Sequence, residues 1–487
     1  MSKIHRQMEF RPALPVVIGN KDYRQMRELA ARIDDVLTRS GLEAEMIEKV
    51  LGPRQAVSAA NWARAWQQTQ IALRCTIARH LTIKAHRGFS ARLADSPLWQ
   101  WFCRIDRLES VRVPSKSALQ RYEAQWSAVE IRWLVQQLNH LAAQPAGAEQ
   151  LGLINTLDVG AYFADTTCVK ANIHFPVDWV LLRDAARTLI KGTMVIRKHG
   201  LRRRMPAPGD FLRQMNRLSI AMTQGRRRPD SRRERKRVLR QMKRLSQVIR
   251  RHAQRHVAAL RDRWTESDLT EGQAAQIIRR MENVLIQLPA AIKQAHERLI
   301  GGRPVANADK LLSLYERDLH VLVRGKADAE VEFGNTLFLA EQGDGLIVDW
   351  KLHRELSPGD GALLDESLER MAAVFGPGAV AAVGGDRGFD RQKTRQRLER
   401  EHIFNGICPR DPRQLRERMR EPDFKAIQWR RAQTEGRIGI FKNDFLERPF
   451  RSKGFAARER SVAWSVLAHN LWIFSELQRA DALEKAA

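Results

Sequence analysis

Three acidic residues occupy places where a folded chain would bring carboxylates together. Asp165 lies in a strand-like stretch, Asp386 directly follows a buried apolar stretch, and Glu435 lies in a long helical stretch. Side chains at the carboxyl ends of strands in an α/β sheet converge on an open crevice. Carboxylates are ligands for Mg²⁺ or Mn²⁺, and two such ions about 3.5–4 Å apart support phosphodiester chemistry. The pattern therefore indicates a two-metal site for phosphoryl transfer.

Each of the three acids also has a structural explanation. Asp165, before two threonines, is typical of a turn or cap, and Asp386, among three glycines, is typical of a tight turn. Glu435 is compatible with a solvated helix residue paired with nearby arginines. Taken singly, each acid favours a structural role. Their joint placement favours the metal site.

The helical stretch around Glu435 carries two adjacent stripes of side chains. The first has spacings of 3, 4 and 7 residues: Gln428, Arg431, Glu435 and Lys442. The second has spacings of 4, 3 and 4 residues and suits burial: Thr434, Ile438, Phe441 and Phe445. One face is thus expected in a core, while its neighbour holds an acid between cations. Such cations suit the binding of phosphates.

The elements that must position these residues alternate between strands and helices after residue 300. A strand is expected at 160–173, and a β-hairpin at 336–350 turns at Gly343-Asp344-Gly345. The elements expected after the hairpin are a helix (362–375), a strand (379–383), a helix (391–401), a strand (405–408) and helices near 425–445 and 457–477. Upstream, 23–50 and 58–145 are expected to be helical, with core residues at 98–102. This order predicts an α/β sheet interrupted by an insertion after its first strand.

Positive charge is concentrated in one part of the chain. The net charge of the 487 residues is +28, and residues 191–260 hold 22 Lys and Arg against 3 acids, an excess of 19. Apolar residues recur at helical spacing through 239–264, and a second helical pattern (278–299) is expected to be bent or broken at Pro289. A solvated cationic face is one interpretation, but this excess favours contact with DNA phosphates. The densest basic residues are Arg226, Arg227, Arg228, Arg232, Arg233, Arg235, Lys236 and Arg237.

Composition excludes several classes of protein. The apolar fraction of 43% and the charged fraction of 29% exclude wholesale disorder. No apolar run approaches the roughly 20 residues of a membrane span, and no signal peptide is expected. The four cysteines form no C-x-x-C pair and are expected to be buried and reduced. A cytoplasmic protein that does not contact membranes is therefore expected.

Several motifs together resemble the DDE transposases of bacterial insertion sequences, whose catalytic domain has a ribonuclease-H-like fold. Arg431-x3-Glu435-x6-Lys442 is similar to the family signature Tyr-x2-Arg-x3-Glu-x6-Lys, with Gln428 in place of the tyrosine. The other similar segments are Asp165-Thr166-Thr167, residues 172–178, Asp386-Arg387-Gly388-Phe389, residues 467–471, and residues 93–102 and 113–122. The resemblance covers about 60–180 and 310–475. Four weak motifs in the right order make it specific.

The resemblance implies an α/β ribonuclease-H-like catalytic core (155–190 plus 306–487). An all-α N-terminal DNA-binding domain (1–150) and a basic α-helical insertion after the first strand (191–305) complete the expected organisation. Asp165, Asp386 and Glu435 would hold two Mg²⁺ ions, with Mn²⁺ as a substitute. The enzyme would cleave the ends of its element and transfer them into target DNA.

Other implied contacts involve the DNA partner. Arg431 and Lys442 would hold phosphates near the cut, with Arg437 as a third, and His174 is expected to be structural, with the rim of the site as the alternative. Lys116 and Arg121 are candidates for reading the terminal inverted repeats. A homodimer on double-stranded DNA, associated with the nucleoid, is expected because two ends must be joined together.

Three other functions share some of these features. A structure-selective nuclease on the same fold would share the acidic residues, without the signature helix. A non-catalytic DNA-binding remnant of a transposase would keep the charge. A basic protein associated with RNA or ribosomes would explain the insertion but leave the acids without a role.

Overall fold

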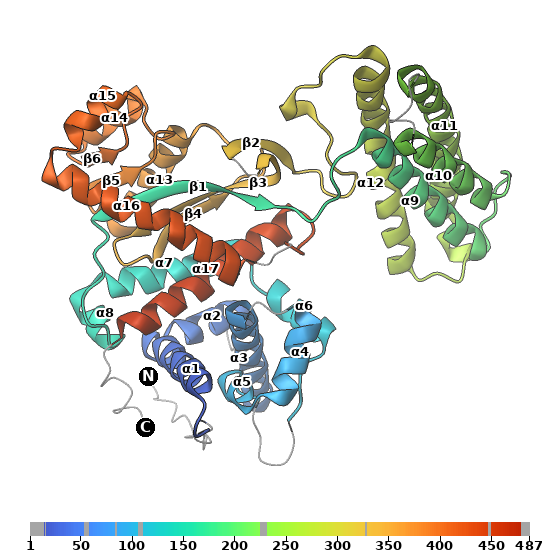
Figure 1. Ribbon diagram of the computed structural model, residues 1–487. Coiled ribbons are helices and arrows are strands. Elements are labelled where there is room, and N and C mark those ends of the chain that lie inside the picture. Colours follow the sequence, from blue (N-terminus) through green and yellow to red (C-terminus); the bar gives the residue numbers. More distant parts are fainter. Residues whose placement is uncertain are drawn as a thin grey trace.

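The computed structural model describes residue 14 and residues 16–52, 58–82, 85–105, 111–224, 231–326, 329–446 and 450–478. Figure 1 shows a central sheet flanked by helices, a group of N-terminal helices beneath it, and a further group of helices to one side. The protein is thus mixed α/β, as expected. Among the described helices, none combines the length and apolar character that a membrane crossing requires.

The sheet contains both parallel and antiparallel strands. Its members are β1 (Ala161–Lys170), β2 (His320–Lys326), β3 (Ala329–Gln342), β4 (Ile347–Leu352), β5 (Ala382–Gly385) and β6 (Phe404–Ile407). Their order is β2–β3–β1–β5–β6, and β4 also pairs with β3. β3 runs antiparallel to β1, β2 and β4, whereas β1, β5 and β6 run parallel to one another. The long β3 thus carries β1 on one edge and β2 and β4 in succession on the other.

Helices cover both faces of this sheet. They are α13 (Asp360–Phe375), α14 (Gln392–Arg400), α15 (Pro412–Arg418), α16 (Pro422–Ile440), the π-helical turn η6 (Phe441–Phe445) and α17 (Phe455–Leu477). Successive side chains of a strand point to opposite faces. Tyr162 bonds to Ser367 of α13, whereas the ring of Phe163 lies 4.6 Å from the Arg430 guanidinium of α16. Odd-numbered residues of β1, including Asp165, therefore belong to the α16 face.

The N-terminal helices share one hydrophobic core with α17 and one face of the sheet. They are α1 (Lys21–Ser40), α2 (Leu42–Leu51), α3 (Ala59–Thr82), α4 (His86–Asp95), α5 (Pro97–Phe102), α6 (Lys116–Ala124), α7 (Ala128–Ala142) and α8 (Pro145–Gln150). Their buried residues Ala30 and Trp99 belong to the same cluster as Leu339 of β3 and Trp464 of α17. The described helices α1 to α8 are therefore packed against the C-terminal helix rather than around a core of their own.

The basic segment forms a helical module with a separate core. Its helices are α9 (Asp178–Lys198), α10 (Pro208–Gln224), α11 (Ser231–Arg263) and α12 (Glu271–His296), followed by the π-helical turn η4 (Glu297–Gly301). Figure 1 shows these helices, in green and yellow, packed together beside the sheet. A buried cluster runs from Trp179 of α9 to Leu314. α12 continues through Pro289, so of the two predicted effects of this proline, a bend or a break, the break does not occur.

Most of the elements expected after residue 330 are present. β3, β4 and the turn at Gly343 and Asp344 form the expected hairpin, and α13, α14, β6, α16 and α17 lie within a few residues of their expected positions. β5 begins at Ala382, later than expected. β2 and α15 were not expected. All four cysteines lie in the described part of the chain, buried and without a disulfide.

Candidate functional site

The two candidate aspartates lie on neighbouring strands. Phe163 of β1 is opposite Gly384 of β5 in the last pair of this parallel ladder. Asp165 and Asp386 each come two residues later, and Asp386 is the first residue after β5. The structure therefore brings both residues to the end of this parallel pairing, although β1 itself continues beyond Asp165 to Lys170.

Backbone hydrogen bonds orient both carboxylates. Asp165 Oδ1 accepts a hydrogen bond of 2.6 Å from the backbone N–H of Thr166. Asp386 Oδ1 accepts one of 2.8 Å from the backbone N–H of Gly388, two residues ahead, which is the geometry of an Asx turn. Both side chains are half-buried. Asp386 therefore has the turn role considered for it, and that role leaves its carboxylate partly open to solvent.

Glycines in the parallel strands allow α16 to lie close to the sheet. A Cβ on Gly384 would lie 3.1 Å from Cγ2 of Ile427, and one on Gly406 would lie 2.5 Å from the same atom. Real Cβ atoms do not come as close as 2.5 Å to a neighbouring atom. A larger residue at Gly406 would therefore displace α16. The helix that carries Glu435 is thus seated on β5 and β6 by the absence of side chains there.

Two hydrogen bonds place the stripe of Glu435 across the same strands. Gln428 Nε2 donates to the carbonyl oxygen of Gly406 in β6 at 2.6 Å. Lys442 Nζ donates to Thr167 Oγ1 in β1 at 2.9 Å, and Thr167 shares the β1 face of Asp165. Glu435 lies between these contacts on the same helical stripe and is exposed. The helix therefore crosses the aspartate-bearing strands with Glu435 on the stripe that joins them.

The adjacent stripe of α16 is fixed by a buried glutamate at the end of β3. Glu341 accepts a hydrogen bond from Thr434 Oγ1 at 2.8 Å and forms an ion pair with Arg430 at 3.0 Å. Arg430 also donates to the carbonyl oxygens of Gln342 and Gly343 at 2.9 and 2.8 Å. The predicted burial of Thr434 is confirmed. The roles of Arg430 and Glu341 were missed, because their meeting depends on how α16 packs against the hairpin.

The three basic candidates on this helix have different surroundings. Arg431 Nε donates to Oε1 of Gln428 at 3.2 Å, and with Lys442 it remains on the stripe of Glu435. Arg437 lies instead against the turn between β3 and β4, with Nη1 3.4 Å from the carbonyl oxygen of Gly343. Burial, followed by the charge of Arg430, lowers the pKa of Arg437. Arg437 is therefore placed to brace the hairpin rather than beside Glu435.

A fourth carboxylate, which the sequence did not single out, lies beside Asp386. A Cβ on Gly388 would collide with the carboxylate of Asp360 and lie 3.0 Å from Oδ1 of Asp386. Asp360 is the first residue of α13 and is half-buried. Its sequence position indicates only an acid at a helix start. Its approach to Asp386 follows from the packing of α13 against the loop after β5.

The candidate metal ligands Asp165, Asp386 and Glu435 all offer carboxylate oxygens, which are hard ligands. Carboxylates of this set suit Mg²⁺ or Mn²⁺. Within the described ranges, no three His, Cys, Asp or Glu side chains are arranged to hold a metal ion. The structure thus brings together the strands of Asp165 and Asp386 and the helix of Glu435. It does not bring the three side chains into a closed cluster.

Comparison with protein-family models, curated proteins and solved structures found no match.

The basic candidates of α11 divide into exposed and engaged side chains. Arg232 and Arg233 are exposed in its first turn. Arg237 is exposed and forms an ion pair with Glu234 at 2.7 Å, and the Arg235 guanidinium lies 5.2 Å from the ring centre of Trp179. Lys236 is half-buried, and Arg226, Arg227 and Arg228 lie outside the described residues. Arg235 therefore contributes to packing, whereas Arg232 and Arg233 face solvent.

The N-terminal candidates lie on the short helix α6. Ser115 caps this helix by accepting a hydrogen bond of 3.3 Å from the backbone N–H of Ala118. Leu119 is buried, while Lys116 and Arg121 are exposed, as the sequence predicts. Both side chains are therefore available for contact with a partner.

Proposed function

We propose that this chain is a DDE-type DNA transposase that cuts DNA at the ends of an insertion sequence and joins those ends to target DNA. The observation that carries the proposal is the position of Asp165 and Asp386 on adjacent parallel strands beneath the helix that carries Glu435. Hydrogen bonds from Gln428 and Lys442 orient that helix across the two strands.

The sheet supports a ribonuclease-H-like core for this proposal. In the order β4–β3–β1–β5–β6, the strands β4, β3 and β1 are antiparallel neighbours. The strands β1, β5 and β6 are parallel neighbours. The helical module lies between β1 and β2 in the chain and does not interrupt this order. In a core of this kind the site would lie where the parallel pairing of β1 and β5 ends, and Asp165 and Asp386 each follow the last pair of that ladder by two residues.

Asp165, Asp386 and Glu435 are the residues proposed to hold two Mg²⁺ ions, or Mn²⁺ in their place. When bound, such ions polarise an attacking oxygen and stabilise the leaving oxygen of a phosphodiester. Their donor chemistry fits these carboxylates, although Glu435 must move toward the aspartates to share an ion. An exposed side chain on a helix surface is able to make that movement without unfolding the helix.

The remaining chemistry belongs to the chain's own cations. Arg431 and Lys442 lie on the stripe of Glu435 and would hold phosphates near the cut. Held in this way, the 3′-hydroxyl of a cut strand would attack target DNA in line, without a covalent enzyme intermediate. Alignment then supplies a large part of the catalysis.

The proposed partner is double-stranded DNA, both the terminal inverted repeats of the element and its target. Arg232 and Arg233 of α11 would contact backbone phosphates, and Lys116 and Arg121 of α6 would contact the repeats. Since two ends are cut and joined together, we propose a homodimer on DNA, located on the nucleoid in the cytoplasm.

Product analysis tests this function directly. The full chain is incubated with Mg²⁺, target plasmid and a duplex that carries the inverted repeat flanking its coding region. We expect cuts at the end of the repeat that leave 3′-hydroxyls, together with joined plasmid products. Cutting of branched DNA without joined products would indicate a structure-selective nuclease instead. DNA binding without any cutting would indicate a non-catalytic DNA-binding protein.

A further inference from the structure

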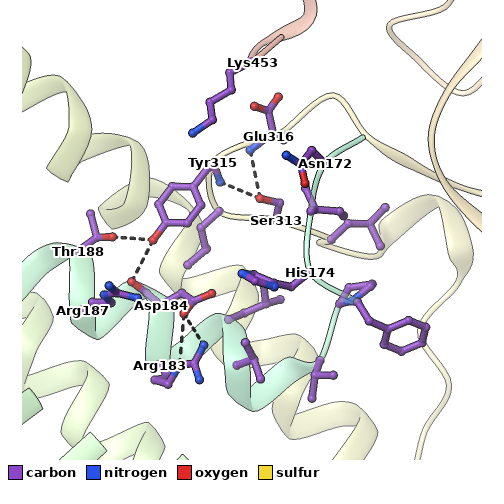
Figure 2. A pocket seen from close by; sticks show the side chains of 18 of the residues that line it. Asn172, His174, Arg183, Asp184, Arg187, Thr188, Ser313, Tyr315, Glu316 and Lys453 are labelled. Atoms are coloured by element: carbon purple, nitrogen blue, oxygen red, sulfur yellow. Dashed lines mark hydrogen bonds and ion pairs between the residues drawn. The ribbon is translucent and has the colours of Figure 1, made fainter. Parts of the chain in front are cut away.

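A cavity of about 710 Å³ lies where the segment after β1 enters the helical module (Figure 2). It is lined by residues 172–177, α9, residues 312–316 and Lys453. A strand rises about 3.3 Å per residue, so Asn172 lies roughly 20 Å from Asp165 along the direction of β1. The cavity is therefore separate from the candidate carboxylate site. His174, expected to be structural, is exposed at this cavity.

Cations from three segments converge on this cavity. Arg187 and Lys191 belong to α9, Arg280 belongs to α12, and Lys453 lies in the segment before α17. Figure 2 shows Lys453 reaching toward Thr188 from the side opposite α9. All four cationic side chains belong to exposed residues. None of the four forms an ion pair with a residue that the structure describes.

The two acids of the cavity do not balance these charges, because each has a basic partner. Asp184 forms an ion pair with Arg183 at 3.0 Å. Glu316 is buried, forms an ion pair with Arg458 and accepts a hydrogen bond of 2.9 Å from the backbone N–H of Gly454. The remaining cations repel one another across the cavity. An anionic ligand would relieve that repulsion.

Aromatic side chains accompany the cations. The Tyr315 hydroxyl donates to the carbonyl oxygen of Asp184 at 3.2 Å and lies 2.6 Å from Thr188 Oγ1. These contacts fix its ring while the residue stays 46% exposed. Phe175 also lines the cavity, is 74% exposed and packs edge-on against Phe333. Cations beside exposed aromatic rings are typical of sites for unpaired nucleic acid strands, whose bases stack on the rings.

The size of the cavity favours a single strand over a duplex. Small-ligand sites occupy roughly 300–1,000 Å³, and the cavity falls in this range. A double helix is much wider, since its major groove alone measures about 12 Å. A duplex could touch only the rim, whereas a nucleotide of an unpaired strand fits inside.

We propose that this cavity binds a nucleotide of an unpaired DNA strand. Lys191, Arg187, Arg280 and Lys453 contact its phosphates, and Tyr315 stacks on its base. The choice of DNA as the source of the phosphates rests on the proposed function. A strand held here bridges the segment before α17, through Lys453, and the helical module, through α9 and α12.

The proposal is tested by measuring the binding of a labelled oligothymidylate to the full chain. Fluorescence anisotropy at several salt concentrations reports the affinity. Lys191→Ala and Lys453→Ala should each lower affinity severalfold and reduce the slope of log K against log salt by about 0.7, the value for one lost contact to a single strand. Lys198→Ala is the matched control, because Lys198 is also exposed on α9 but does not line the cavity. It should match the wild type.

A second variant tests the stacking contact. Tyr315→Leu should weaken binding of the oligonucleotide roughly tenfold or more, since the stacked ring is lost. Tyr315→Phe keeps the ring and should retain most of the affinity. Thermal unfolding of each variant identifies any loss of oligonucleotide affinity that comes from misfolding. If Tyr315→Leu binds like the wild type while folded, no base stacks on Tyr315 and the assignment is overturned.

Several results would overturn the strand site as a whole. These are lysine variants that behave like Lys198→Ala, lysine variants that change only duplex binding, or a wild-type chain that does not bind the oligonucleotide. Binding of inorganic pyrophosphate by a chain that does not bind DNA would assign the cavity to a small anion instead. Failure of the proposed function is distinguishable. A chain that never cuts DNA, yet loses strand affinity in the lysine variants, would keep this site and lose the transposase assignment.

Discussion

At the scale of single residues, Gly388 separates two carboxylates beside the proposed site. A Cβ there would collide with Asp360 and crowd Asp386. We expect Gly388→Ala to lower Mg²⁺-dependent DNA cleavage at least tenfold because the Asp360 carboxylate is pushed from its place beside Asp386. The free energy of unfolding should change by less than about 1 kcal/mol, since the obstructing atoms lie at the end of a side chain. Cleavage rates and chemical denaturation measure the two effects.

Gly359→Ala provides the control for that substitution. Gly359 lies next to Asp360, but a Cβ there would meet no atom within 4 Å. This variant should cleave DNA like the wild type. Equal activity of the Gly388 and Gly359 variants would show that the position of Asp360 beside Asp386 has no part in the reaction.

His469, in α17, makes stability depend on pH. Burial first, and the charge of Arg437 to a smaller extent, lower the pKa of its imidazole from 6.5 to about 4. Between these values the unfolded chain binds a proton that the folded chain does not. The free energy of unfolding should therefore fall as pH falls from about 6.5 to 4, by up to about 3 kcal/mol.

Chemical denaturation at several pH values, with His469→Gln as the reference, measures this effect. The difference in the free energy of unfolding between wild type and variant should shrink toward low pH, because only the wild type loses the contribution of the neutral His469 imidazole. His353 also has a pKa lowered to about 4, but it is present in both proteins and cancels. A difference that stays constant from pH 7 to 4 would mean that folding does not lower the pKa of His469.

At the scale of elements, the seating of α16 depends on glycine in the parallel strands and not on glycine in the helix. Gly406→Ala would bring a Cβ within 2.8 Å of the carbonyl oxygen of Val383, which is backbone and unable to move aside. We expect a loss of about 1–3 kcal/mol in the free energy of unfolding. Gly436→Ala meets no atom within 4 Å on the exposed side of α16 and should stabilise by about 0.5–1 kcal/mol.

Equilibrium denaturation of the two alanine variants checks this contrast. If both substitutions changed stability by the same amount and sign, α16 would not be seated on β6 through Gly406. Loss of cleavage in the Gly406 variant, with DNA affinity retained, would further connect the seating of this helix to the position of Glu435.

The elements around the site were largely predictable because local patterns encode them. The apolar runs beside Gly343-Asp344-Gly345 predict the hairpin, and spacing along 428–445 predicts which side of α16 is buried. β2 was missed because its sequence, HVLVRGK, is short and mixes apolar and basic residues. Asp360 and the pairing of Arg430 with Glu341 were missed for another reason. They depend on contacts between elements far apart in the chain, which no local period records.

At the scale of the whole molecule, the helical module and the N-terminal helices belong to different hydrophobic cores, which charge alone did not reveal. The helical module has its own buried cluster from α9 onward, whereas the N-terminal helices share theirs with α17. Charge and composition located the basic segment but not its start at Asp178. The shared core was not predictable, because no local sequence pattern links residues near 30 to residues near 470.

The exposed basic face of α11 should determine the salt dependence of duplex binding. Arg232→Ala combined with Arg233→Ala should weaken binding to all DNA sequences and flatten the slope of log K against log salt by about 0.9 for each lost phosphate contact. Arg400→Ala, an exposed arginine on α14 paired with Glu401, is the control and should have little effect. Titrations of labelled duplexes at several salt concentrations measure both. An unchanged slope in the double variant would assign this face to another purpose, such as contact between subunits.

We propose that Asp165, Asp386 and Glu435 act together in metal-dependent cutting of DNA. The most direct measurement is the Mg²⁺-dependent cleavage rate of wild type, Asp165→Ala, Asp386→Ala and Glu435→Ala on the same duplex, with DNA affinity measured in parallel. We expect each substitution to abolish cleavage while DNA affinity stays close to that of the wild type. Undiminished cleavage in any one of the three variants would contradict it.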